Sequence, residues 1–315
     1  MRIVSLLPSA TEILFAVGAG DDVVGVTFEC DHPPEARTRR IVSTSALPEG
    51  LTPPEIDAAV AARMRAGEDL YHLDAGALAD LGADLVVTQD LCAVCALDAA
   101  DVEAALEHLG CDGRVLTVAP GDLREVLASI GVLGDAVGAG PAARRLVGDL
   151  EDRLAAVRDR VAGARRPRTL VLEWTDPPYA PGHWVPDMVA AAGGAGVLGS
   201  ASRESERVTW QAVAAARPDV VVCAPCGFGL ADAAAAGRDL LGRGVLPRDA
   251  EVWAVDANAS WARPGPRLVD GVEALAGILH PGRAGPPHPD RAQILRRTPT
   301  TTPARVTSSS GTIGS

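Results

Sequence analysis

The first 27 residues constrain the fold more than any other stretch, because a strand, a helix and a second strand follow one another without a break. Arg2–Leu6 is a short apolar run with β-branched residues at its centre and predicts a buried strand. Ser9 and Glu12 have capping-box spacing, so we expect a helix that begins at Ser9 and ends at the following glycines. Val23–Val26 predicts the second strand. The chain therefore opens with a β-α-β unit.

The alternation of strands and helices continues and predicts an α/β fold with mainly parallel sheets. Further strands are expected at Leu85–Thr88, Val115–Val118, Thr169–Glu173, Val220–Ala224 and Glu251–Val255. Helices are expected at Pro54–Arg65, Ala99–Leu109, Asp187–Ala192, Thr209–Ala216 and Arg267–Leu279. Each half of the chain should therefore form a Rossmann-like lobe, with helices on both faces of its sheet.

One long helix is expected between the two halves. Within residues 141–163, apolar side chains recur at helical spacing, at Leu146, Leu150, Leu154, Val157 and Val161, and charged residues fill the other faces. A helix of this length spans roughly 35 Å and would act as a rigid spine. We expect an N-terminal lobe at residues 1–138, the spine helix at 139–164, a C-terminal lobe at 165–282 and a disordered tail at 283–315, which is rich in Pro, Thr, Ser and Arg.

Composition and charge exclude several classes of partner. The formal net charge is −12 and the pI is near 5.0, which argues against binding nucleic acid, since that requires a basic face. The longest apolar runs fall short of the ~20 residues that span a bilayer, so we expect no membrane span. The apolar start is already used by a strand and a helix, so we expect no signal peptide and a cytoplasmic location. A periplasmic or other extracytoplasmic location is the alternative if the true start lies upstream.

An internal similarity points to where a ligand would bind. Leu78–Cys92 and Ala212–Cys226 share a plan of helix end, Asp, apolar strand and Cys-bearing loop, with Asp84 corresponding to Asp219. Two lobes built alike would each present such a loop at the carboxyl end of a strand. In open α/β sheets, ligands bind at that end.

Loops after the predicted strands carry the candidate ligand-binding residues. Three of the ten aromatic residues fall within residues 174–184, where they would supply rigid contact area to a macrocycle, or would instead pack the lobe interface. A histidine in this loop would bind a ligand or satisfy a local carbonyl group. The candidates are Ser9, Phe28, Glu29, Gln89, Trp174, Tyr179, His183, Trp184 and Phe228. No catalytic residue is assigned.

Four cysteines on these loops are candidate metal ligands: Cys30, Cys92, Cys95 and Cys226. Cys92 and Cys95 form a lone CxxC pair, which would provide half of a zinc or iron–sulfur site. Two alternatives stay open, namely small buried thiols in a core and thioredoxin-like redox chemistry.

Several segments resemble the periplasmic-binding-protein family for vitamin B12 and iron chelates, whose members are helical-spine substrate-binding proteins of ABC importers. They are PSATEIL (Pro8–Leu14), the spine helix, GHWVPDMVAAAGG (Gly182–Gly194) and GVEALAGILHP (Gly271–Pro281), and the resemblance covers about residues 2–281. It implies two lobes that hold a macrocyclic or metal-chelate ligand between them with little hinge motion. The expected ligand is cobalamin or a related corrinoid, or an iron chelate, and the expected partner is an ABC permease.

With no export signal expected, the resemblance also implies a leaderless branch of the family, a cytoplasmic corrinoid carrier or sensor. The cysteine-bearing loops keep a second function class open. In that class the same scaffold would be a zinc- or iron–sulfur-dependent enzyme, because a fold does not fix a function.

Overall fold

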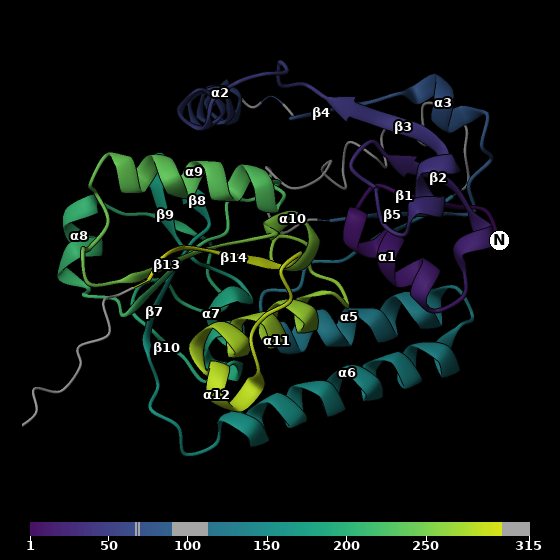
Figure 1. Cartoon of the computed structure of the whole chain (residues 1–315). Helices are drawn as coiled ribbons and strands as arrows, with labels where there is room; N and C mark the ends of the chain where they lie inside the picture. Colours follow the sequence, from purple (N-terminus) through teal and green to yellow (C-terminus); the bar gives the residue numbers. More distant parts are fainter. Residues whose placement is uncertain (67, 69, 90–112, 298–315) are drawn as a thin grey trace, which may run out of the picture.

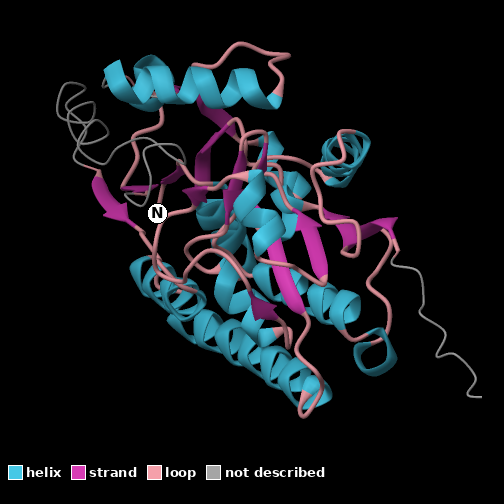
Figure 2. Ribbon diagram, turned by 90° about the vertical axis from the view of Figure 1, so that its left-hand side faces the viewer, coloured by secondary structure: helices cyan, strands magenta, loops and turns pink. Residues whose placement is uncertain are grey.

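A computed structural model of the chain describes residues 1–66, 68, 70–89 and 113–297. Two α/β lobes lie side by side along one long helix (Figure 1). Figure 2, turned by 90°, shows helices on both sides of the strands. The predicted fold class is therefore confirmed. The predicted helix at Ala99–Leu109 lies outside the described residues.

The N-terminal lobe is built on a six-stranded sheet in the order β4-β3-β2-β1-β5-β6. Every pair in it is parallel except β3 with β4. The strands are β1 (Ile3–Ser5), β2 (Val23–Thr27), β3 (Arg40–Ser45), β4 (Tyr71–Leu73), β5 (Leu85–Thr88) and β6 (Arg114–Thr117). The helices are α1 (Pro8–Ala16), α2 (Pro53–Ala66), α3 (Ala75–Ala79) and α5 (Leu123–Ala136), with short 3-10 turns at Gly20–Asp22 and Pro34–Thr38.

The first helix begins earlier than its capping pattern predicts. Leu7 is the N-cap of α1, Pro8 occupies the first turn, and no side chain caps the helix. Proline is well suited to this position because its missing N–H would have no partner there. The capping-box prediction for Ser9 and Glu12 is thus wrong, and Glu12 is left to bind residues of the other lobe.

The C-terminal lobe contains a five-stranded sheet in the order β10-β7-β12-β13-β14 and a small antiparallel sheet in the order β11-β9-β8. Its strands are β7 (Arg168–Leu172), β8 (Trp174–Thr175), β9 (Pro178–Ala180), β10 (Ala195–Gly196), β11 (Glu206–Arg207), β12 (Val220–Cys223), β13 (Glu251–Val255) and β14 (Ala292–Arg296). Its helices are α7 (Val185–Ala191), α8 (Trp210–Ala215), α9 (Leu230–Gly242), α10 (Ala257–Ser260), α11 (Leu268–Leu279) and α12 (Pro281–Ala284).

The prediction of a disordered tail from residue 283 is wrong for the part of it that the structure describes. Strand β14 pairs antiparallel with β13, and Ile294 lies opposite Trp253. Leu295 packs on the apolar cluster beneath α9, and Ala292 is buried. The short apolar pattern of β14 gives little local indication of a strand. The strand is stabilised by pairing with β13, about 40 residues earlier in the chain.

The spine is α6 (Gly140–Val161), and it lies beside α5 (Figures 1 and 2). Its 22 residues span about 33 Å. Leu150, Leu154, Val157 and Val161 are buried, as their helical spacing predicts. They belong to the largest apolar cluster, which also contains residues of both lobes. The two lobes and the spine therefore share one continuous core.

The predicted similarity of the two halves is visible in their hydrogen bonds. Asp84, before β5, accepts a hydrogen bond from the Arg2 N–H at 2.7 Å. Asp219, before β12, accepts one from the Arg168 N–H, also at 2.7 Å. Each Asp thus fixes the register of its strand against the first strand of its own lobe.

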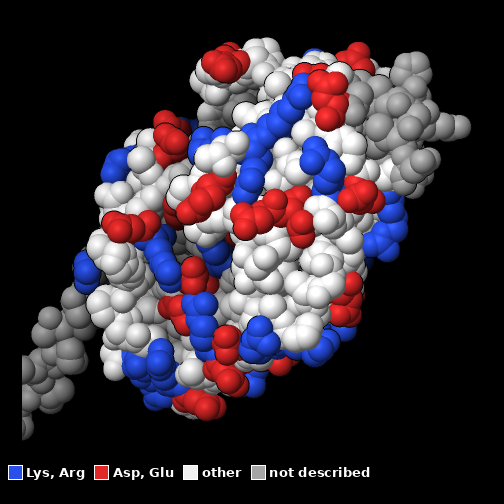
Figure 3. Space-filling view, turned by 90° about the vertical axis from the view of Figure 1, so that its right-hand side faces the viewer, with Lys and Arg blue, Asp and Glu red and all other residues white. Residues whose placement is uncertain are grey.

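The surface of the N-terminal lobe carries charges of both signs. On the face drawn in Figure 3, acidic and basic side chains are interspersed. Ion pairs of this lobe include Arg39 with Asp21 at 3.6 Å and Arg40 with Asp80 at 3.3 Å. Within the described residues, no helix has both the length and the apolar character that crossing a membrane requires.

Candidate functional site

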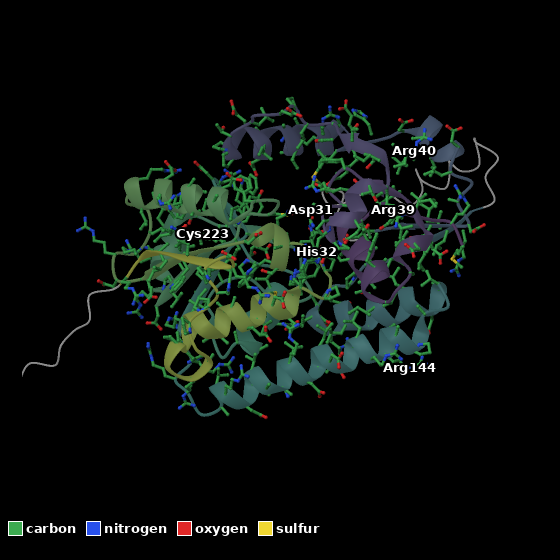
Figure 4. All side chains as sticks on the ribbon, turned by 45° about the vertical axis from the view of Figure 1, so that its right-hand side comes forward. Asp31, His32, Arg39, Arg40, Arg144 and Cys223 are labelled. Atoms are coloured by element: carbon green, nitrogen blue, oxygen red, sulfur yellow. The ribbon has the colours of Figure 1, made fainter. Side chains whose placement is uncertain are left out.

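The loops after β2, β7 and β12, which carry predicted binding residues, are joined by contacts at the boundary between the lobes. The Asn258 side-chain amide on α10 donates to Asp31 Oδ2 at 3.2 Å, which links the loop after β2 to the C-terminal lobe. The Asn258 N–H donates to the Phe228 carbonyl at 3.0 Å. The Phe228 ring meets the Trp174 ring edge-on, at 5.5 Å between centroids. Figure 4 shows Asp31 and His32 between the lobes, beside α10.

Each lobe contributes an aromatic pair to this boundary. On the N-terminal side, Phe28 lies 6.1 Å from Tyr71, centroid to centroid, and Tyr71 hydrogen bonds to Glu29. On the C-terminal side are Trp174 and Phe228. All four rings are half-buried. Half-buried rings with polar neighbours are the surface that a large planar ligand needs, since they offer rigid contact area at low entropic cost.

A buried ion-pair cluster joins the lobes next to these rings. Arg263 hydrogen bonds to Asp31, donates to the Glu29 carbonyl at 3.0 Å and lies 3.4 Å from Glu12 Oε1. Arg267 donates to Glu12 Oε2 at 2.9 Å and also binds Oε1. Glu12 and Arg263 are only 4% and 8% exposed. Removing one partner would leave the other charge buried and unpaired, so the cluster holds the lobes in register.

The pKa values of the two carboxyl groups after β2, those of Glu29 and Asp31, are shifted in opposite directions. Burial raises the pKa of Glu29, and Arg263 and Tyr71 offset that effect only in part. Burial also acts to raise the pKa of Asp31, but the hydrogen bond and the charge of Arg263 outweigh it, so the Asp31 pKa lies below its ordinary value. Asp31 is thus committed to the ion pair, whereas Glu29 ionises less readily.

Tyr179 crosses the boundary at another point. Its hydroxyl donates to Asp57 Oδ1 on α2 at 3.1 Å. Burial, and then the Asp57 charge, raise the pKa of the Tyr179 phenol. This predicted ligand-binding residue therefore already has a partner on the opposite lobe.

Ser9 and Gln89 lie together in a small pocket. Both are buried, and they line it with apolar side chains and with Pro264 from the C-terminal lobe. The pocket has a volume of about 10 Å³, roughly the space of one water molecule. It is therefore far too small for a macrocycle.

A sequence model of the periplasmic binding protein family matches residues 3–241. The chain belongs to this family. The match covers the N-terminal lobe, the spine and most of the C-terminal lobe. We call the boundary between the two lobes the cleft.

Known periplasmic binding proteins resemble the chain over most of its length. The uncharacterized ABC transporter substrate-binding lipoprotein YvrC of Bacillus subtilis (strain 168) is 25% identical over 293 residues, which is 89% of this chain and 80% of that protein. The periplasmic vitamin B12 binding protein BtuF of Vibrio cholerae has a TM-score of 0.64 at 22% identity, covering 88% of this chain and 96% of that one. A periplasmic heme binding protein from Pseudomonas aeruginosa has a TM-score of 0.67 at 21% identity, covering 90% and 93%. At these identities the two structural likenesses show the fold.

Two predicted ligand-binding residues, His183 and Trp184, make hydrogen bonds within the C-terminal lobe. Trp184 is 6% exposed, and its indole N–H donates to the Trp261 carbonyl at 2.7 Å. His183 has a positive φ of 48°, and its N–H donates to the Arg203 carbonyl at 2.7 Å. Burial lowers the pKa of the His183 ring. Trp184 therefore serves the core, and His183 fixes the loop that precedes α7.

The cysteines show no metal centre in the described part of the chain. Cys30 is 2% exposed, its sulfur lies 3.0 Å from Thr11 Oγ1, and burial raises the pKa of its thiol to about 11. Such a thiol stays protonated at neutral pH. Cys226 is exposed, and Cys92 and Cys95 lie outside the described residues. No group of three His, Cys, Asp or Glu side chains among the described residues is placed to hold a metal ion. Within the described residues, nothing favours the metalloenzyme alternative.

Sequence reasoning missed several residues of the cleft: Glu12 as an ion-pair partner, Asp31, Tyr71, Asn258, Arg263 and Arg267. The signal that was available is the run Trp261–Arg267, which places two arginines in a Pro- and Gly-rich loop shortly after the carboxyl end of β13. Their partners on α1 and after β2 are more than 200 residues away, so no local pattern pairs them.

Proposed function

We propose that this periplasmic binding protein is the substrate-binding component of an ABC importer and holds a corrinoid, such as cobalamin, between its two lobes. Aromatic side chains of both lobes supply the contact area: Phe28, Tyr71, Trp174 and Phe228. The ion-pair cluster and the spine fix the separation of the lobes, which lowers the ordering cost of binding.

Membership of the family supports the binding role. The Bacillus subtilis relative is an ABC transporter substrate-binding lipoprotein, and the two solved neighbours bind vitamin B12 and heme. The same relatives favour an extracytoplasmic location over the cytoplasmic one that the sequence predicts, with an ABC permease as partner. No observation supports a leaderless branch.

The charges of the cleft favour a corrinoid over heme, and this is the observation that carries the choice of ligand. Heme has two propionates that require cations, but two buried or half-buried arginines at the lobe boundary, Arg263 and Arg267, are already paired with Glu12 and Asp31. The corrin ring instead carries peripheral amides. Their N–H groups can donate to carboxylates such as Glu29, which lies beside the aromatic pair of the N-terminal lobe.

Titration of the purified protein with cyanocobalamin, followed by calorimetry and by tryptophan fluorescence, tests this proposal. Hemin and ferrichrome are titrated in parallel under the same conditions. One-to-one binding of cyanocobalamin at micromolar concentration or below, with weaker binding of the other two, is the expected result. Preferential binding of hemin or ferrichrome would overturn the corrinoid assignment, and binding of none would overturn the proposed class of ligand.

A further inference from the structure

Helix α2 does not pack like the other long helices. Between β3 and β4 the chain leaves the sheet of the N-terminal lobe, forms α2 and returns. The Ala46 N–H donates to the Leu70 carbonyl at 2.9 Å, which closes the base of this excursion. None of the residues of α2 is buried. The helix is therefore attached at its base and is not part of the core.

One face of α2 is nevertheless turned toward the molecule. Pro53, Ile56, Asp57 and Val60 are half-buried and recur at helical spacing, whereas Pro54, Glu55 and Ala58 are exposed. Ile56 and Val60 belong to none of the apolar clusters that the described residues form. This face of α2 is therefore partly shielded from solvent but is not packed into an apolar core.

The face of α2 that is turned toward the molecule also contacts the opposite lobe. Asp57 on α2 accepts the hydrogen bond from Tyr179 on β9, although α2 belongs to the N-terminal lobe by its connections. Figures 1 and 4 place α2 at the end of the molecule opposite α6. The spine thus joins the lobes on one side, and α2 joins them on the other.

We propose that α2 is a lid on the cleft, hinged at Ala46 and Leu70 and latched by the Tyr179–Asp57 hydrogen bond, and that it opens to admit and release the ligand. This inference rests on the proposed function, because a lid requires a ligand beneath it. One latching hydrogen bond corresponds to about a fivefold change in the ratio of closed to open lid. Such a latch slows ligand exchange without preventing it.

The latch can be observed without any ligand. The chain contains only two tyrosines, Tyr71 and Tyr179, so incorporation of 3-fluorotyrosine gives two ¹⁹F NMR signals that a Tyr71→Phe variant assigns. The Tyr179 signal should shift in Asp57→Ala, which removes the acceptor, and stay unchanged in the matched control Asp80→Ala, at an exposed acid of the same lobe. A Tyr179 signal that does not respond to Asp57→Ala would overturn the latch.

The lid itself is tested by removing it. In one variant a short Gly-Ser linker joins Leu47 to Leu70, and stopped-flow fluorescence measures the exchange of cyanocobalamin. We expect a Tm within a few degrees of the wild type, and dissociation at least tenfold faster. Asp57→Ala, which removes the acceptor of the latching hydrogen bond, should dissociate about fivefold faster. A variant that fails to fold, or unchanged rates, would overturn the lid. If cyanocobalamin does not bind to the wild type, the proposed function fails, while the ¹⁹F signals still decide whether the latch exists.

Discussion

Arg263 of the C-terminal lobe hydrogen bonds to Asp31 of the N-terminal lobe, although 232 residues separate them in the chain. The same guanidinium contacts Glu12 and the Glu29 carbonyl, so one side chain joins α1 and the loop after β2 to the loop before α11. With Arg267, it makes the lobe boundary a fixed surface on one side of the cleft.

Replacing Arg263 with alanine should lower the free energy of unfolding by about 3 kcal/mol, because Glu12 and Asp31 would be left without their shared buried partner. Urea denaturation measures this. Arg37, whose side chain is 67% exposed and lies 4.0 Å from Asp31, provides the control. Arg37→Ala should cost less than about 0.5 kcal/mol. Equal losses in the two variants would contradict the role of the buried cluster.

Glu173 should make the protein less stable as the pH rises toward neutral. Burial raises the pKa of this carboxyl to about 7, and hydrogen bonds from Ser205 and the Gly182 N–H offset the effect only in part. The folded protein therefore holds a proton on Glu173 that the unfolded chain releases near pH 4.5. The stability that this group contributes is fully present below that pH and is lost as the pH rises through 7.

The variant Glu173→Gln removes this titration; its amide oxygen can still accept from the Gly182 N–H, and its NH2 group can donate to the Ser205 hydroxyl oxygen. It should be more stable than the wild type at pH 8, by on the order of 2 kcal/mol. Thermal unfolding between pH 4 and pH 8 measures the difference. Glu206→Gln, an exposed neighbour on β11, should leave the pH profile unchanged. A wild-type profile that is flat over this range would refute the assignment.

The two tryptophans of the loop at residues 174–184 should respond in opposite ways to truncation. Trp184 lies in the core, so Trp184→Ala should cost about 3–5 kcal/mol of stability. Trp174 is half-buried against Phe228 in the cleft, so Trp174→Ala should cost about 1 kcal/mol but weaken cyanocobalamin binding at least tenfold. Chemical denaturation and calorimetry separate the two effects. Unaltered affinity in Trp174→Ala would remove that ring from the site.

Cys30 should resist alkylation in the folded protein. Its thiol is buried and has a pKa of about 11, so about 0.1% is thiolate at pH 8. With iodoacetamide at pH 8, peptide mapping should find Cys226 modified and Cys30 unmodified, and denaturant should make both react. Rapid labelling of native Cys30 would show that the loop after β2 opens.

Within the described residues, each strand and helix that the local patterns predicted is present, because strand and helix periodicity is set by neighbouring residues; β3, α5 and α9 were not predicted. The spine is the clearest case, since Leu150, Leu154 and Val157 keep helical spacing and are buried. Strand β14 was missed because its pairing with β13, and not its own composition, orders it. The helix start at Pro8 was misjudged because a proline competes with Ser9 for the same turn.

The ligand-binding role of the candidate residues stays a prediction, but the place where their loops lie in the fold was predicted in outline. Phe28, Glu29, Trp174 and Phe228 do lie where the two lobes meet, because carboxyl ends of parallel strands share one edge of a sheet. Which of the neighbouring side chains face the boundary was not predictable. Trp174 and Trp184 look alike in the sequence, and only the turn between them directs one toward the cleft and the other into the core.

The sequence by itself determined the α/β class, the spine helix and the repeated use of an Asp before β5 and β12, because each depends on contacts within a lobe or a single element. The tertiary structure alone decided that Arg263 and Arg267 bind Glu12 and Asp31, and that Asp57 on α2 reaches Tyr179. Those contacts join residues more than 100 positions apart. Their geometry exists only after both lobes have packed on the common core, so no local pattern encodes it.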